Sequence, residues 1–171
     1  MSVIHIIVYI IICYLIGSIP SGLIIGRIFK NVDIRKHGSG NLGGTNAVRV
    51  LGITLGILVG LMDIMKGGVC IILAYKVFAP TIIPPIFFGI AAVIGHIFPI
   101  FARFKGGKAV ATSAGVILFS SPPIFLFGVT VFAIVVLATK IVSLASSIVA
   151  VAIVLMTFIA NKLGAIPFFS K

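Results

Sequence analysis

Residues 50–75, VLGITLGILVGLMDIMKGGVCIILAY, form an apolar run in which Asp63 and Lys66 are the charged residues. A helix of about 20 apolar residues crosses the hydrocarbon core of a bilayer, and this run exceeds that length. Asp63 and Lys66 lie three residues apart, so they share a helix face and can pair. Such a pair inside a span is often functional, but we slightly favour a neutralising pair that fixes helix packing. The stretch predicts a membrane-spanning helix with an internal ion pair.

Further apolar runs lie on both sides of this helix. They cover residues 3–26, 82–100, 109–138 and 148–160. Only 9% of the 171 residues are charged, whereas soluble proteins carry about a quarter. The sequence therefore predicts an all-α polytopic membrane bundle of five to six helices, organised as one membrane-embedded domain over residues 1–171.

The run at 109–138 contains the pair Pro122-Pro123. Proline cannot donate a backbone hydrogen bond and breaks a helical ladder. The run is therefore either one long span or two short helices that bend at the prolines and return to the same side. Lys140 favours the bent hairpin if it is cytoplasmic, and we adopt the hairpin as the expectation.

The charge of the chain is strongly one-sided, with 13 Lys and Arg against two acids. The positive-inside rule places residues 27–49 and 101–108 in the cytoplasm and the N-terminus outside. The excess positive charge fits either anionic lipid head groups or an anionic ligand. Nucleic acid is not an expected partner, because most of the chain lies in lipid. No metal is expected, because two distant acids and three scattered histidines do not form a metal site.

The polar segment GSGNLGGTN, residues 38–46, matches the spacing GxGxxG of dinucleotide folds. That fingerprint needs a preceding strand and a βαβ unit, whereas membrane helices flank this segment. Its composition still suits a phosphate group, because glycines let several backbone N–H groups approach one anion. Arg49 adds a bidentate cation, and a helix starting near Thr45 or Asn46 would favour negative charge. From composition alone, a solvated loop that joins two helices is an equally good interpretation.

A second polar segment, GHIFPIFARFKGGKAVAT at residues 95–112, again combines flexible backbone with cations. Gly106 and Gly107 lie between Lys105 and Lys108. The alternative is a basic loop that meets lipid head groups, which is a common arrangement. His96 near the end of an apolar run is more often a packing or hydrogen-bonding residue than a catalyst.

Five segments, in this order, resemble the bacterial membrane glycerol-3-phosphate acyltransferases that use acyl phosphate as donor. The resemblance covers the chain from end to end. Its motifs are GSIPSG (17–22), DIRKHGSGNLGGTNAVRVLG (33–52), DIMKG (63–67), GHIFPIFARFKGGKAVAT (95–112) and VSLASS (142–147).

This resemblance implies transfer of a fatty acyl group from acyl phosphate to the 1-hydroxyl of sn-glycerol 3-phosphate. The products are lysophosphatidic acid and phosphate, in the first step of bacterial phospholipid synthesis. The family fold is a helical bundle with seven spans in full-length members, located in the bacterial plasma membrane with a cytoplasmic active site. Neither a metal nor a coenzyme is implied.

Motif by motif, the resemblance also assigns residues. It places Ser39, Arg49, Lys108 and Ser146 at phosphate-binding and catalytic positions. The further residues expected to bind substrate or shape its pocket are Gly38, Gly40, Asn41, Gly43, Thr45, Asn46, His96, Lys105, Gly106 and Gly107.

Members of that family continue into another span and a motif rich in His, Asn, Arg and Glu, which has no counterpart here. The chain is therefore expected to be either truncated or a divergent short member, with weakened phosphate binding that could extend to a complete loss of activity. Two alternatives to the acyltransferase remain at this point: a transporter or channel subunit for a small anion, and an inactive truncated paralogue.

Overall fold

The computed structural model describes residues 2–78 and 83–162, and every regular element within these ranges is helical. The chain forms two compact units, residues 1–120 and 121–171, which are described one at a time. The elements of the first unit are α1 (Val3–Gly17), α2 (Ser21–Lys30), η1 (Ile34–Lys36), α3 (Gly44–Leu51), α4 (Ile53–Lys76), α5 (Ile86–Ile97), η2 (Ile100–Ala102) and α6 (Val110–Ser120). Those of the second unit are α7 (Pro122–Thr139) and α8 (Val142–Lys162).

Four helical segments of the described chain are long and apolar enough to cross a membrane. They are residues 3–30, 53–76, 122–139 and 142–162, and α5 and α6 are apolar but shorter. With 24 residues, α4 is about 36 Å long at 1.5 Å per residue, enough to cross the hydrocarbon core. The predicted class of helical membrane protein is confirmed.

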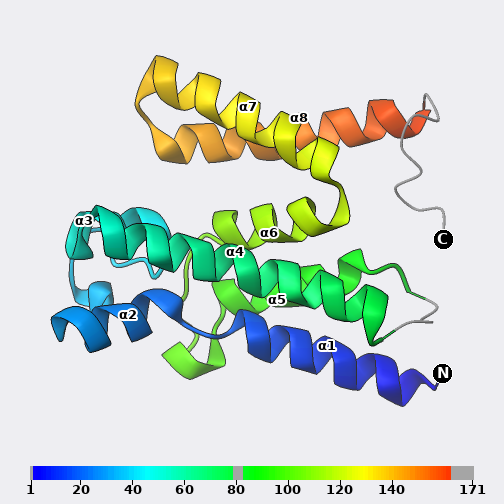
Figure 1. Cartoon of the computed structure of the whole chain (residues 1–171), viewed down its shortest axis with the longest axis horizontal. Coiled ribbons are helices and arrows are strands. Elements are labelled where there is room, and N and C mark those ends of the chain that lie inside the picture. Colours follow the sequence, from blue (N-terminus) through cyan, green and yellow to red (C-terminus); the bar gives the residue numbers. More distant parts are fainter. Residues whose placement is uncertain (1, 79–82, 163–171) are drawn as a thin grey trace. The chain divides into compact units, whose positions relative to one another are not determined.

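In the first unit, α1, α4 and α5 lie alongside one another (Figure 1). Glycines permit their close approach: a methyl group at Gly17 would overlap the Ala92 backbone, and one at Gly95 would overlap the Tyr14 carbonyl. Small residues at helix crossings are the usual means of tight packing in membranes, where burial of apolar surface gives no net gain between helices. These contacts hold α5 in place, and the loop of residues 103–109 packs against its end.

The first apolar run, predicted to be continuous over residues 3–26, is divided into two helices. α1 ends at Gly17 and α2 begins at Ser21, with Pro20 between them. Proline disfavours helical backbone in the residue before it, so the chain breaks at Ile19. The break exposes backbone groups of residues 18–20 inside the first unit.

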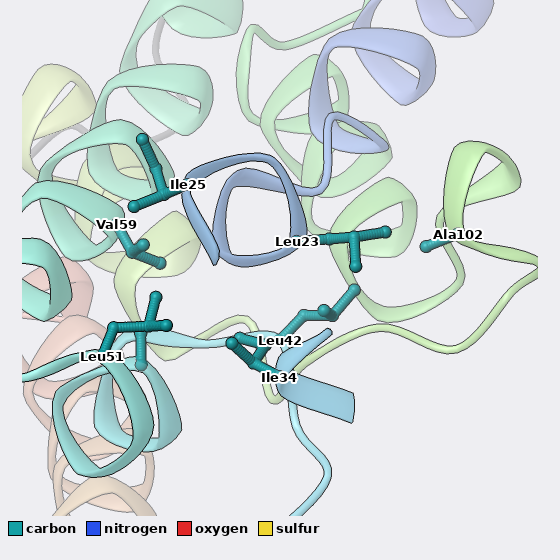
Figure 2. Packing of buried hydrophobic residues seen from close by; sticks show 8 residues of the cluster. Leu23, Ile25, Ile34, Leu42, Leu51, Val59 and Ala102 are labelled. Carbon is teal, nitrogen blue, oxygen red and sulfur yellow. The ribbon is translucent and has the colours of Figure 1, made fainter. Parts of the chain in front are cut away.

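The short helix α3 and the turn η1 rest on a small apolar core. This core lies beneath residues 37–43, the first glycine-containing loop. Figure 2 shows its members gathering from α2, η1, α3, α4, η2 and the loop itself. Leu42 belongs to the loop and is buried in this core, and its backbone lies against Gly22 of α2. The core comprises Leu23, Ile25, Ile34, Leu42, Ala47, Leu51, Val59 and Ala102.

The run at 109–138 is interrupted just before its proline pair, at Ser121. Pro122 is the first residue of α7, a position where its missing N–H costs nothing. The structure therefore forms two helices rather than one long span. The last apolar run was expected over residues 148–160, but the helix begins earlier: α8 starts at Val142, so the segment VSLASS lies within it. The hydroxyl groups of Ser146 and Ser147 both donate to the Ser143 carbonyl within that helix, which satisfies them in an otherwise apolar element.

Candidate functional site

The first glycine-containing loop, residues 37–43, is organised by the side chain of Asn46. This carboxamide is buried, and its oxygen accepts a hydrogen bond from the Ser39 N–H at 2.9 Å. Its nitrogen lies within hydrogen-bond distance of three carbonyl oxygens, those of Ile34, His37 and Asn41. All polar atoms of Asn46 are thus occupied by the loop backbone. Asn46, in the first turn of α3, thus organises the loop with its side chain, whereas direct phosphate binding by Asn46 stays a prediction.

Two glycines of this loop adopt left-handed backbone, with φ of 60° at Gly38 and 74° at Gly40. Residues with a Cβ rarely adopt this conformation, so glycine is needed at both positions. Gly38 is also crowded, because a methyl group there would overlap Asn46 Oδ1 and lie 3.2 Å from Arg49 Cδ. The Arg49 side chain therefore passes beside Gly38 at the start of the loop, and both Arg49 and Ser39 are exposed.

The loop leads directly into α3, whose N-cap is Gly43. The sequence predicted this helix start near Thr45 or Asn46, and the helix begins at Gly44. The first amide groups of a helix have no partner within it and favour an anion. The same short helix carries a cation, Arg49, in its last turn.

The second glycine-containing loop, residues 103–109, packs against the end of α5. The Gly107 N–H donates to the His96 carbonyl at 3.2 Å. A methyl group at Gly106 would overlap the His96 and Ile97 carbonyl oxygens, and one at Gly107 would overlap His96 Nε2. These two positions therefore require glycine for close approach of the backbone.

Three non-glycine residues in this loop have left-handed backbone: Arg103, Phe104 and Ala109, with φ of 57°, 59° and 56°. Each such residue costs on the order of 1–3 kcal/mol and persists only when its surroundings enforce it. Strained backbone of this kind clusters at functional sites. The loop carries Lys105 and Lys108, both exposed.

The two loops meet in space. A methyl group on Gly107 would lie 3.3 Å from the Gly43 amide nitrogen, so the two backbones approach each other closely at this point. A second connection joins the turns that precede the loops: Nη1 of Arg35 in η1 donates to the Ala102 carbonyl in η2 at 3.2 Å. The structure thus brings together, from segments about 60 residues apart in the sequence, the two loops that the sequence singled out.

Arg35 is held in place by a bidentate ion pair with Asp33, at 2.9 Å from Nε to Oδ1 and 2.6 Å from Nη2 to Oδ2. These hydrogen bonds lower the pKa of Asp33 to about 2 and raise the pKa of Arg35. The pair is therefore ionised at neutral pH. The sequence analysis did not foresee the bond from Arg35 to Ala102. The available signal was the i,i+2 spacing of Asp33 and Arg35, which form the ion pair that holds Arg35.

Beneath the loops lies a buried ion pair. Asp63 and Lys66 of α4 are 1% and 7% exposed, and Lys66 Nζ is 2.9 Å from Asp63 Oδ1. The prediction that these residues pair on one helix face is confirmed. Lys66 also donates to the Ile19 carbonyl at 3.0 Å, at the break between α1 and α2.

Other elements contribute to the surroundings of Asp63. Ser21 Oγ donates to Asp63 Oδ1 at 2.9 Å, and His96 Nδ1 lies 3.6 Å from the same oxygen. The small cavity that Ser21, Lys66 and His96 help to line has about 10 Å³, which is room for at most one water molecule. This buried cluster is therefore not a substrate pocket.

A larger open groove of about 320 Å³ runs between α2 and η2. Its lining is apolar apart from one cation, Arg27. This combination suits an amphiphilic anion, with an apolar chain in the groove and a charged group at its edge. The groove is lined by Ile19, Pro20, Leu23, Ile24, Arg27 and Phe101.

Ser146, the remaining residue predicted to be catalytic, belongs to α8 in the second unit. Its Oγ donates to the Ser143 carbonyl at 2.9 Å. Its participation in the site stays a prediction.

Comparison with known proteins places the chain among relatives. A family described as glycerol-3-phosphate acyltransferase matches residues 7–170. The glycerol-3-phosphate acyltransferase of Bacillus velezensis is 56% identical over 131 residues, covering 77% of this chain and 67% of that protein. The protein of the same description from Enterococcus faecalis is 53% identical over 154 residues, covering 90% of this chain and 70% of that protein.

Solved structures agree with the sequence relatives. The crystal structure of PlsY (YgiH), an integral membrane glycerol 3-phosphate acyltransferase, in its glycerol 3-phosphate form superposes with a TM-score of 0.84 at 41% identity. That match covers 90% of this chain and 76% of the other. The lysophosphatidic acid form of PlsY matches with a TM-score of 0.81 at 40% identity.

Proposed function

The chain belongs to the glycerol-3-phosphate acyltransferase family, and from this premise we propose that its two glycine-containing loops together hold the phosphate groups of the reaction. The protein is an integral membrane enzyme that transfers an acyl group to glycerol 3-phosphate. We propose acyl phosphate as the donor, with the 1-hydroxyl of glycerol 3-phosphate as acceptor.

The observation that carries this proposal is the contact of Gly107 with the Gly43 amide. It brings the two glycine-containing loops together, with Arg49 beside the first loop and Lys105 and Lys108 on the second. Backbone amides and cations in this arrangement bind phosphate without an acid or a metal. Two phosphates, one from each substrate, need just such a cationic surface.

In the proposed reaction the acceptor hydroxyl oxygen attacks the acyl carbonyl carbon. The ester C–O bond forms, the C–O bond to phosphate breaks, and inorganic phosphate leaves. The hydroxyl proton passes to a phosphate oxygen of the substrates. Because an acyl phosphate is already activated, the protein contributes positioning and stabilisation of negative charge. Ser39, Arg49, Lys108 and Ser146 are the residues we assign to these tasks.

We propose that the groove between α2 and η2 holds the acyl chain of the donor. Its apolar lining matches a hydrocarbon chain, and Arg27, the cation in that lining, matches the phosphate end. The groove belongs to the same unit as both loops, so chain and phosphates are bound by one set of elements.

An assay of membranes with acyl phosphate and labelled glycerol 3-phosphate tests the function. We expect lysophosphatidate to form with acyl phosphate and not with acyl coenzyme A.

Arg49→Lys is expected to raise KM for glycerol 3-phosphate about tenfold, because an ammonium cannot bind phosphate in the bidentate manner of a guanidinium. Lys76→Arg, an exposed exchange in the last turn of α4, is the control and should leave KM unchanged. Failure of the wild-type protein to acylate glycerol 3-phosphate from acyl phosphate would refute the proposal.

We propose that the protein resides in the plasma membrane with its loops toward the cytoplasm, because the basic residues of segments 27–49 and 101–108 obey the positive-inside rule there. The variant Lys36→Cys should react with a membrane-impermeant maleimide only after cells are permeabilised. Lys76→Cys should react in intact cells. The reverse labelling pattern would invert the topology.

A further inference from the structure

Asp63 lies where three helices and their connecting segments converge. Its Oδ1 atom contacts Lys66 Nζ of the same helix, Ser21 Oγ of α2 and His96 Nδ1 of α5. Asp63 is 1% exposed, and its partners Lys66 and His96 are 7% and 5% exposed. A single oxygen atom thus ties together the break after α1, the middle of α4 and the end of α5.

His96 transmits this arrangement to the second glycine-containing loop. Its Nδ1 atom faces Asp63, whereas its Nε2 atom lies against Gly107, so closely that a methyl group at Gly107 would overlap it. The backbone carbonyl of His96 accepts the Gly107 N–H. Both the ring and the backbone of one residue therefore determine where Gly107 lies, next to the Gly43 amide.

We propose that Asp63, with its partner Lys66, and His96 are positioning residues for the second glycine-containing loop. The Asp63 carboxylate, 3.6 Å from Nδ1, attracts that edge of the imidazole, and the opposite edge of the ring lies against Gly107 and so sets the approach of the two loops. This inference rests on the proposed function, in which the meeting point of the loops binds phosphate. None of these side chains needs to touch substrate.

Packing alone does not account for this cluster. Replacing a buried ion pair by apolar side chains of similar volume is often neutral or stabilising, so a charge pair is weak evidence for a stabilising role. Within the described residues, Asp63 Oδ2 and His96 Nδ1 have no hydrogen-bond partner. The polar group that faces Nδ1 of the His96 ring is the Asp63 carboxylate, at 3.6 Å. What the polar pair provides, and apolar residues would not, is a defined orientation of the His96 ring.

The test measures amide hydrogen exchange of the full-length protein in detergent micelles, together with acylation kinetics. The double variant Asp63→Asn/Lys66→Met removes both charges at once, so no unpaired charge is left buried. His96→Phe keeps a ring of similar size and the backbone carbonyl but lacks both nitrogens. We expect either variant to accelerate exchange of peptides spanning residues 104–108 about tenfold and to lower kcat/KM about tenfold, as for a misplaced binding group. Thr112→Val, a nearly isosteric change at another buried polar residue, is the matched control and should exchange as wild type.

A combined variant that carries Asp63→Asn, Lys66→Met and His96→Phe distinguishes a positioning role from a general loss of stability. If Asp63 acts through His96, the combined variant should be no more than about twofold worse than either alone, because residues on one path are non-additive. Wild-type exchange in the loop of the double variant would overturn the proposal. Equal acceleration throughout α4 and α5 would overturn it as well, because the pair would then stabilise the bundle and not the loop.

The exchange measurement needs no substrate, so it is independent of the proposed reaction. A wild-type protein without acyltransferase activity would refute the proposed function. Amide hydrogen exchange of residues 104–108 would still decide the role of Asp63 and His96.

Discussion

Gly106→Ala is expected to lower kcat/KM for glycerol 3-phosphate acylation by about a hundredfold, which is roughly 3 kcal/mol of transition-state stabilisation. A methyl group at this position overlaps the carbonyl oxygens of His96 and Ile97. Both are backbone atoms at the end of α5, so they cannot move aside as a flexible side chain would. The loop must leave α5, which breaks the hydrogen bond from Gly107 to His96 and separates the loop from Gly43. Misplacement of binding groups by about 1 Å is enough for a loss of this size.

Gly60→Ala is the matched control for this variant. Gly60 lies inside α4, and a methyl group there has no neighbouring atom within 4 Å. The same chemical change should therefore leave kcat/KM within about twofold of wild type, and alanine is the better helix former by about 1 kcal/mol. Steady-state kinetics of both variants at equal protein levels provide the measurement. A Gly106→Ala enzyme with wild-type kcat/KM would contradict the packing of the second loop against α5.

Lys66→Met is expected to destabilise the protein by about 3–5 kcal/mol, the usual loss when one partner of a buried ion pair is removed. The variant leaves the Asp63 carboxylate buried with Ser21 and His96 as its polar neighbours. It also removes the donor to the Ile19 carbonyl. Reversible unfolding in mixed micelles, followed by circular dichroism, measures the change in the free energy of unfolding.

The double variant Asp63→Asn/Lys66→Met should recover a large part of this loss, because it leaves no uncompensated charge. Lys76→Met is the matched control: this lysine is exposed at the end of α4, so its replacement should change stability by less than about 0.5 kcal/mol. A double variant as unstable as Lys66→Met would show that the ammonium stabilises the fold through Ile19 and not through Asp63.

Features that depend on local chain geometry could be predicted from the sequence. The i,i+3 spacing of Asp63 and Lys66 predicted a pair on one helix face, and the pair is present. The proline pair predicted a break in the run at 109–138, and α7 begins at Pro122. Composition likewise predicted a helical membrane protein.

Features that depend on how helices cross could not be predicted in this way. Neither Ser21 nor His96 is near Asp63 in the sequence, and only the packing of α2 and α5 against α4 brings them to one carboxylate oxygen. Asn46 illustrates the same limit. Its residue type suggested a ligand donor, whereas the fold of the loop turns its carboxamide inward onto backbone groups.

The break between α1 and α2 also bears on how the chain enters the membrane. A lysine near the middle of an inserting helix costs about 2.5–3.5 kcal/mol when the helix enters lipid alone. The Ile19 carbonyl and the Ser21 hydroxyl belong to a segment that is synthesised before α4. When the ribosome delivers α4, polar groups for its charged pair are therefore already in the bilayer. The break between α1 and α2 thus serves as a docking point for α4. Because α1 and α2 are synthesised before α4, this order lowers the barrier to inserting a charged helix.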